Sequence, residues 1–300
     1  MTNKILFRGV ASALITPFSA GEIDYPSLRR IINAQIRAGI DALVIGGTTG
    51  EASTLSHDEK LKLYSFVIKE VSGRIPVIVG CGSNDTKRAV ALAKSIKGLS
   101  ADGILSVTPY YNKGTHEGIK KHYLSIAEAT NLPIIIYNVP QRTGVNLPIS
   151  LIEELAEHEN IVGIKEASDS AERLLNLSCL SDKIKLYSGN DGMTLQTLAL
   201  GGEGVISVVS NIFPTAMHKL CESFFMGDLS RAGEIGRSLI PMTNALFCDV
   251  NPVPIKYCMS LAGFCSPEVR LPLSLPKSDS AKLIQDAYEK YKKEHPELAV

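Results

Sequence analysis

The chain has 300 residues, 45% of them apolar, and equal numbers of acidic and basic side chains give it a formal net charge of zero. This length and apolar content suffice for one large core. A neutral chain without long runs of like charge is not expected to bind nucleic acid or an anionic membrane surface. The N-terminus lacks the apolar stretch of a signal peptide, and no run of about 18 apolar residues occurs, so we expect a cytoplasmic protein without a membrane span.

The six cysteines form no CxxC pair and show no zinc-like spacing with the six histidines. We expect them to be free, mostly buried thiols, which fits a reducing compartment. The sequence contains no HExxH, GxxxxGK or GxGxxG motif, so the commonest metal, nucleotide and dinucleotide signatures are absent. We therefore expect no cofactor and no metal site.

Short apolar runs alternate with amphipathic segments along most of the chain. Eight such runs occur, at 9–16, 42–46, 76–80, 103–107, 133–137, 161–164, 184–188 and 204–208. The helical patterns between them include 25–38, 56–71, 86–96 and 115–128. Ser56, followed three residues later by Glu59, predicts a capping box at the start of the second helix. Near-continuous apolar strands separated by helices indicate a parallel sheet covered on both faces. Eight units predict an α/β fold of the (β/α)8 TIM-barrel type, with an open doubly wound sheet as the alternative.

After the eighth run the pattern changes to helices alone, at 214–225, 230–245, 254–262 and 280–295. We expect residues 1–227 to form the barrel and residues 228–300 to form a C-terminal helical region beside it. The apolar side chains of this region, including Met242, Leu246, Phe247 and Met259, are expected to be core or subunit contacts.

Lys165 ends an apolar run that is typical of a fully buried strand. Burial disfavours the charged ammonium and lowers the pKa of a lysine from about 10.4, which leaves some neutral amine able to attack a ketone. The resulting Schiff base is a common route to making and breaking carbon–carbon bonds. The alternative is a lysine that leaves the strand end and points into solvent.

Polar residues also follow other strand ends, which meet at one face of such a barrel. The glycine-rich turn 46–51 offers backbone N–H groups and threonine hydroxyls to a small anion, although a tight turn alone would also require glycines. Tyr137 ends the fifth run and is suited to proton transfer, or is simply a wall residue. Arg142 follows it, and its guanidinium could bind a carboxylate in two-pronged fashion or form a surface ion pair.

Six ordered motifs resemble the dihydrodipicolinate synthase family. They are 46–51, 110–111, 137–144, 163–166, 188–191 and 204–207, and the resemblance extends from residue 9 to about residue 276, including the segment 251–256. It implies a Schiff-base aldolase-type lyase that condenses pyruvate with L-aspartate 4-semialdehyde, an early step of diaminopimelate and lysine biosynthesis. It also implies a homotetramer built as a dimer of dimers.

The resemblance assigns roles to individual positions. The implied catalytic residues are Lys165 for the Schiff base and, for a proton relay, Tyr137, Thr48 and Tyr111, the last reaching in from a neighbouring subunit. The implied substrate-binding residues are Thr49, Ile206 and Gly189 for pyruvate and Arg142 for the carboxylate of the semialdehyde. Arg142 with the following Thr-Gly favours the synthase over N-acetylneuraminate lyase and other pyruvate-dependent aldolases, whose substrate choice rests on few residues.

Lysine-inhibited members of the family bind lysine in a pocket that His57, Asn84 and Tyr110 match. Lys60 and Arg88, however, stand where those members carry a histidine and a glutamate. Two added cations should repel a cationic ligand, so we expect weak or absent feedback by lysine. Two alternatives of other classes are a non-catalytic barrel that binds a keto acid and a metal-dependent aldolase. The complete set of proton-relay residues argues against the first, and the missing ligand motifs argue against the second.

Overall fold

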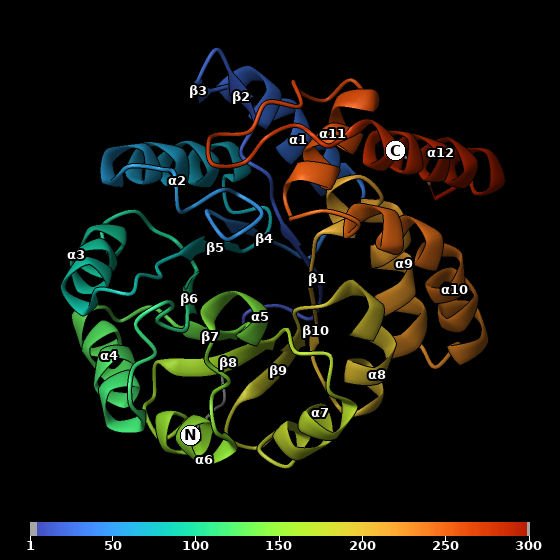
Figure 1. The fold of residues 1–300 in the computed structure, drawn as a ribbon. Coiled ribbons are helices and arrows are strands. Elements are labelled where there is room, and N and C mark those ends of the chain that lie inside the picture. The colour runs from blue at the N-terminus through green and yellow to red at the C-terminus, as the bar shows by residue number, and fades with distance from the viewer. Residues whose placement is uncertain (1–4, 299–300) are drawn as a thin grey trace.

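The computed structural model describes residues 5–298 and forms a closed barrel of eight parallel strands (Figure 1). Around the barrel the strands follow one another in the order β1, β4, β5, β6, β7, β8, β9, β10, and β10 pairs with β1 to close it. The bounds of these strands are β1 Gly9–Ala13, β4 Ala42–Ile45, β5 Val77–Gly80, β6 Gly103–Val107, β7 Ile134–Asn138, β8 Ile161–Glu166, β9 Lys185–Ser188 and β10 Gly204–Ser207. Each falls within or overlaps one of the eight predicted apolar runs, and the TIM-barrel prediction is confirmed.

Helices separate consecutive strands and form the outer layer. Their bounds are α1 Tyr25–Arg37, α2 His57–Val71, α3 Thr86–Ile96, α4 His116–Ala129, α5 Pro140–Thr143, α6 Ile149–Leu155, α7 Ala171–Ser178 and α8 Thr194–Ala199, with the 3-10 turns η1 Asp191–Met193 and η2 Val209–Asn211. The predicted capping box is present: the Ser56 hydroxyl accepts from the Glu59 N–H, and the Glu59 carboxylate accepts from the Ser56 N–H. The short antiparallel strands β2 Phe18–Ser19 and β3 Glu22–Ile23 were not predicted.

Four further helices follow the barrel, within two residues of the predicted bounds at each end. They are α9 Pro214–Phe225, α10 Leu229–Leu246, α11 Val253–Leu261 and α12 Ser278–Glu294. Figure 1 shows them, in orange and red, gathered along one side of the barrel and over one end of it. Met242, Leu246 and Met259 are buried there, whereas Phe247 is exposed. In the described part of the chain no helix is long and apolar enough to cross a membrane.

The strands face two separate apolar regions, and alternation along each strand decides which side chain enters which. Ile134 and Ile136 of β7 pack into the large layer between strands and helices, while Ile135 and Tyr137 belong to the smaller cluster inside the barrel. In β10, Val205 lies in the outer layer and Ile206 lies inside. Because successive side chains of a strand point to opposite faces, this pattern fixes which polar residues reach the barrel interior.

Candidate active site

Lys165 and Tyr137 lie side by side at the C-terminal ends of neighbouring strands. Ile164 of β8 packs outward, so the next side chain, Lys165, points into the barrel. Tyr137 also points inward, and the strand register pairs it directly with Lys165. Both side chains are buried, and the Lys165 Nζ lies 4.3 Å from the centre of the Tyr137 ring. This places an amine and a phenol together at the end of the barrel where catalytic groups of this fold gather.

A buried carboxylate, Asp191, lies near this pair. Its two oxygens accept hydrogen bonds from the Ser207 hydroxyl and from the N–H groups of Val208 and Val209, which ties η1 to the end of β10. Burial raises the pKa of Asp191, while these hydrogen bonds and the positive charge of Lys165 act in the opposite direction. Our sequence reasoning quoted Asp191 only as part of a motif and gave it no role.

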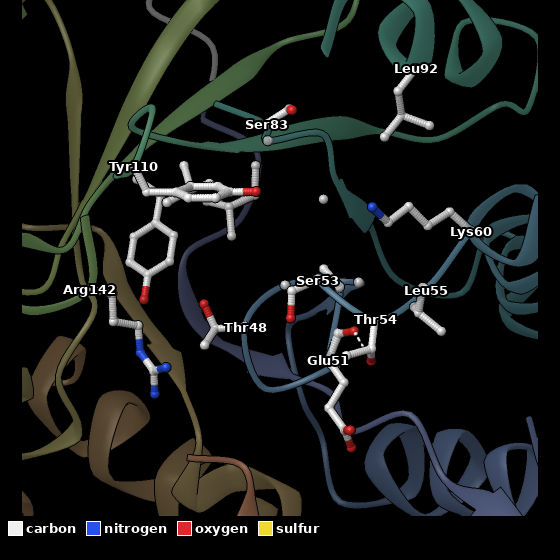
Figure 2. A pocket seen from close by; sticks show the side chains of 18 of the residues that line it. Thr48, Glu51, Ser53, Thr54, Leu55, Lys60, Ser83, Leu92, Tyr110 and Arg142 are labelled. Carbon is white, nitrogen blue, oxygen red and sulfur yellow. Dashed lines mark hydrogen bonds between the residues drawn. The ribbon is translucent and has the colours of Figure 1, made fainter. Parts of the chain in front are cut away.

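A cavity of about 740 Å³ opens beside Tyr137. Three residues predicted for catalysis or substrate binding line it together: Thr48, Tyr137 and Arg142. They come from three different segments, the loop after β4, the end of β7 and the helix α5. Figure 2 shows the Thr48 hydroxyl in the middle of the view, between Arg142 on one side and Ser53 on the other. This volume is sufficient for a small substrate or substrate pair.

The predicted anion turn is held by its own backbone and by a tyrosine beneath it. The N–H groups of Glu51 and Ala52 donate to the carbonyls of Thr48 and Gly47, so these two groups serve the turn itself. Gly46 has a φ of +64°, and a Cβ there would collide with the ring of Tyr64. A glycine is therefore required at the start of the turn that presents Thr48.

Glu51, at the end of this turn, also lines the cavity, but its carboxylate forms a buried ion pair. The Lys256 ammonium donates to one oxygen of the Glu51 carboxylate at 2.5 Å. The main-chain N–H of Arg270 donates to the other oxygen at 2.9 Å. Figure 2 shows the Glu51 carboxylate turned away from Thr48. No local spacing predicts this pair, because its members are 205 positions apart in the chain.

Arg142 and Thr49 both contact Asn251, a residue that sequence reasoning did not single out. The Arg142 guanidinium donates to the Asn251 carbonyl at 3.0 Å, and the Asn251 side-chain amide donates to the Thr49 hydroxyl oxygen at 3.0 Å. Asn251 itself lines the cavity. The segment before α11 therefore supplies part of the site, although we expected this region to provide packing only.

Not all predicted residues line the cavity. Within residues 5–298, its lining does not include Lys165, Thr49, Tyr111, Gly189 or Ile206. Lys165 and Ile206 are buried inside the barrel, and the Gly189 N–H donates to the Glu166 carbonyl at 2.6 Å, joining the ends of β8 and β9. Tyr111 is 87% exposed and has a φ of +74°, a conformation that is costly for a bulky residue.

The cavity wall also includes most of the residues compared with a lysine-binding pocket. His57, Lys60, Arg88 and Tyr110 line it, whereas within the described residues Asn84 does not. Figure 2 shows the Lys60 ammonium pointing toward the middle of the cavity. Burial lowers the pKa of Lys60.

The geometry defines a class of protein: a barrel enzyme of the lyase type, with an amine, a phenol and a guanidinium at the C-terminal ends of its strands. Residues 6–290 match the sequence model of the dihydrodipicolinate synthetase family. The chain is 45% identical over 278 residues to the 4-hydroxy-tetrahydrodipicolinate synthase of Pelobacter propionicus, covering 92% of this chain and 96% of that protein. It is 46% identical over 286 residues to the synthase of Thermotoga neapolitana, covering 93% and 97%.

Comparison with a solved structure supports the same family assignment. The dihydrodipicolinate synthase from Thermotoga maritima superimposes with a TM-score of 0.94 at 42% identity, covering 96% of this chain and 99% of that structure. The chain therefore belongs to the dihydrodipicolinate synthetase family.

Proposed function

We propose that this chain condenses pyruvate with L-aspartate 4-semialdehyde, the reaction of a 4-hydroxy-tetrahydrodipicolinate synthase in diaminopimelate and lysine biosynthesis. The observation that carries the proposal is the register pair of Tyr137 and Lys165 inside the barrel, next to a cavity that Arg142 also lines. The family assignment and the names of the relatives support the same reaction.

In the proposed reaction the amine of Lys165 attacks C2 of pyruvate, and uptake of one proton with loss of water gives a protonated imine. The imine draws electrons from the neighbouring methyl carbon, which loses a proton to become an enamine. The enamine carbon then attacks the aldehyde carbon of the second substrate, the aldehyde oxygen takes up a proton, and water releases the product from Lys165. These steps transfer protons, and Tyr137, whose ring centre lies 4.3 Å from the Lys165 Nζ, carries a phenol able to donate and accept them.

The supporting residues have proposed roles that follow their positions. Thr48 lies in the cavity with Tyr137 and would continue a proton relay. Thr49, Ile206 and Gly189 would hold pyruvate, and Arg142 would bind the carboxylate of the semialdehyde. Tyr111, which is largely exposed in the single chain, would complete the relay in a neighbouring subunit. An exposed aromatic side chain on strained backbone is what such an exchange requires.

This role of Tyr111 leads us to propose a homotetramer arranged as a dimer of dimers. We further propose a cytoplasmic location, which the free thiols support: all six cysteines are unpaired, and Cys81, Cys221 and Cys258 are buried. The described residues contain no group of three or more His, Cys, Asp or Glu side chains arranged to hold a metal ion.

A coupled assay tests the proposed function. The purified chain is given pyruvate, L-aspartate 4-semialdehyde, a reduced nicotinamide and an excess of the reductase that consumes the product. The reductase should oxidise the nicotinamide only when both substrates are present. Turnover of another pyruvate-derived aldol substrate, with none of the semialdehyde, would assign the chain to a different activity in the same class.

A further inference from the structure

Asn251 lines the cavity and has no role in the reaction proposed above. It lies in the segment that precedes α11, outside the barrel strands, and its side chain is only 9% exposed. It nevertheless lines the cavity together with Thr48, Tyr137 and Arg142. Its position is fixed from both sides, because its amide group donates to Thr49 and its carbonyl accepts from Arg142.

The side-chain oxygen of Asn251 has no partner. The Oδ1 atom is buried, and no donor among residues 5–298 lies within hydrogen-bond distance of it. A buried amide oxygen without a partner is costly, and such atoms in folded proteins are usually satisfied by a bound molecule, by water or by a functional contact. Because the residue lines the substrate cavity, this acceptor is available to a substrate that carries a hydrogen-bond donor.

The two proposed substrates differ in what they offer to such an acceptor. Pyruvate carries a carboxylate and a ketone, both of which accept hydrogen bonds. L-Aspartate 4-semialdehyde carries an α-ammonium group on the same carbon as its carboxylate, and an ammonium only donates. The Arg142 guanidinium donates to the main-chain carbonyl of Asn251, and the side-chain oxygen of the same residue is a neutral acceptor, so a carboxylate-binding group and an ammonium acceptor meet at one residue.

An amide is also better suited than a carboxylate at this position. An aspartate next to Arg142 would pair with the guanidinium and compete with the substrate for it. The asparagine side chain accepts a hydrogen bond without carrying a charge, so it does not form an ion pair with the guanidinium. We propose that Asn251 is a specificity-determining residue whose Oδ1 accepts a hydrogen bond from the α-ammonium group of the semialdehyde while Arg142 binds its carboxylate. This inference rests on the proposed function of the site.

The test compares L-aspartate 4-semialdehyde with succinate semialdehyde, which has the same chain but no ammonium group. In Asn251→Leu, the KM for L-aspartate 4-semialdehyde should rise about ten-fold or more, the effect of losing a hydrogen bond to a charged group. The inhibition constant of succinate semialdehyde should change less than about three-fold, since that molecule never made the bond. Formation of the borohydride-trapped pyruvate adduct should be unchanged.

Two further variants separate recognition from positioning. Thr49→Val removes the partner of the Asn251 amide group, and it should weaken pyruvate binding while leaving the preference for aspartate over succinate semialdehyde intact. Asn251→Asp keeps an acceptor oxygen, so the preference should survive even if both aldehydes bind less well beside Arg142. Circular dichroism spectra check that each variant is folded. If Asn251→Leu does not fold, the substrate preference of Asn251→Asp tests the role of Asn251.

The outcomes distinguish this inference from the function on which it rests. If the wild-type chain does not consume L-aspartate 4-semialdehyde, the proposed function and this inference both fail. If the wild-type chain turns over but Asn251→Leu keeps the full preference for the ammonium-bearing aldehyde, only the role of Asn251 is overturned. Loss of the preference in Asn251→Asp, or in Thr49→Val, would also overturn it, because the effect would then come from positioning of the turn.

Discussion

Removing the ammonium group of Lys256 should destabilise the fold by about 3–5 kcal/mol, because it leaves a carboxylate buried without its counter-charge. Lys256 and Glu51 have 0% and 1% exposed side chains, and the two charged groups lie 2.5 Å apart. In Lys256→Met the Glu51 carboxylate keeps one hydrogen bond, from the Arg270 N–H at 2.9 Å. The Glu268 carbonyl also loses its donor, which lies 2.6 Å away in the wild-type chain.

A loss of this size is a large share of the stability of a single domain, which is typically about 5–15 kcal/mol. Urea unfolding followed by circular dichroism would measure it, and this signal is preferable because the chain has no tryptophan. Lys120→Met is a matched control. Lys120 pairs with Glu154 at 2.6 Å, but both side chains are substantially exposed, so the urea midpoint should not move.

A second variant tests whether the uncompensated charge is the cause. In Glu51→Gln combined with Lys256→Met, neither charge of this pair remains, and part of the lost stability should return. A Lys256→Met variant that loses less than about 1 kcal/mol, as an exposed pair does, would show that the buried charge is not costly here. A double variant no more stable than the single one would show the same.

Three other predictions concern the proposed reaction, and one concerns pH. Tyr137→Phe should lower kcat by about 10²–10⁴-fold and still form the trapped pyruvate adduct, because it removes a proton carrier and leaves the amine; an unchanged kcat in the coupled assay would exclude the role. Arg142→Ala should raise the KM for the semialdehyde about ten-fold or more with little change for pyruvate, and equal effects on both substrates would argue against selective carboxylate binding. L-Lysine at sub-millimolar concentration should leave the initial rate unchanged, because the ammonium of Lys60 points into the pocket in question; half-maximal inhibition in that range would show the expectation to be wrong. Burial lowers the pKa of His122 to about 4, below its value of about 6.5 in an unfolded chain, so the unfolded state takes up the proton first and stability should fall as pH drops from 6.5 to 4. His122→Gln should flatten this part of the stability curve, and an unchanged slope would contradict the assignment.

Sequence periodicity predicted the barrel well because its strands are buried on both sides. Runs such as 133–137 are almost entirely apolar, and few other structures accept such a run next to an amphipathic helix. The short strands β2 and β3 were not predicted, because a strand of two residues is too short to show an alternation of apolar and polar side chains. The division into residues 1–227 and 228–300 stays a prediction.

The candidate site was partly predictable for a related reason. Lys165 and Tyr137 end two strands that are consecutive in sequence, and parallel strands bring such ends together. Asn251 could not be placed in this way, since its contact with Thr49 joins positions 202 residues apart, one of them in the helical tail. The pairing of Glu51 with Lys256 could not be predicted for the same reason. Tertiary packing brings the two residues together, and no local sequence spacing indicates it.

We propose that Lys165 is the amine that forms the Schiff base. Incubating the chain with pyruvate and sodium borohydride, digesting it and measuring the peptide masses tests this most directly. We expect a reduced pyruvyl group on the peptide that contains Lys165, and no such group in Lys165→Ala. An unmodified Lys165, or an adduct on a different lysine, would contradict it.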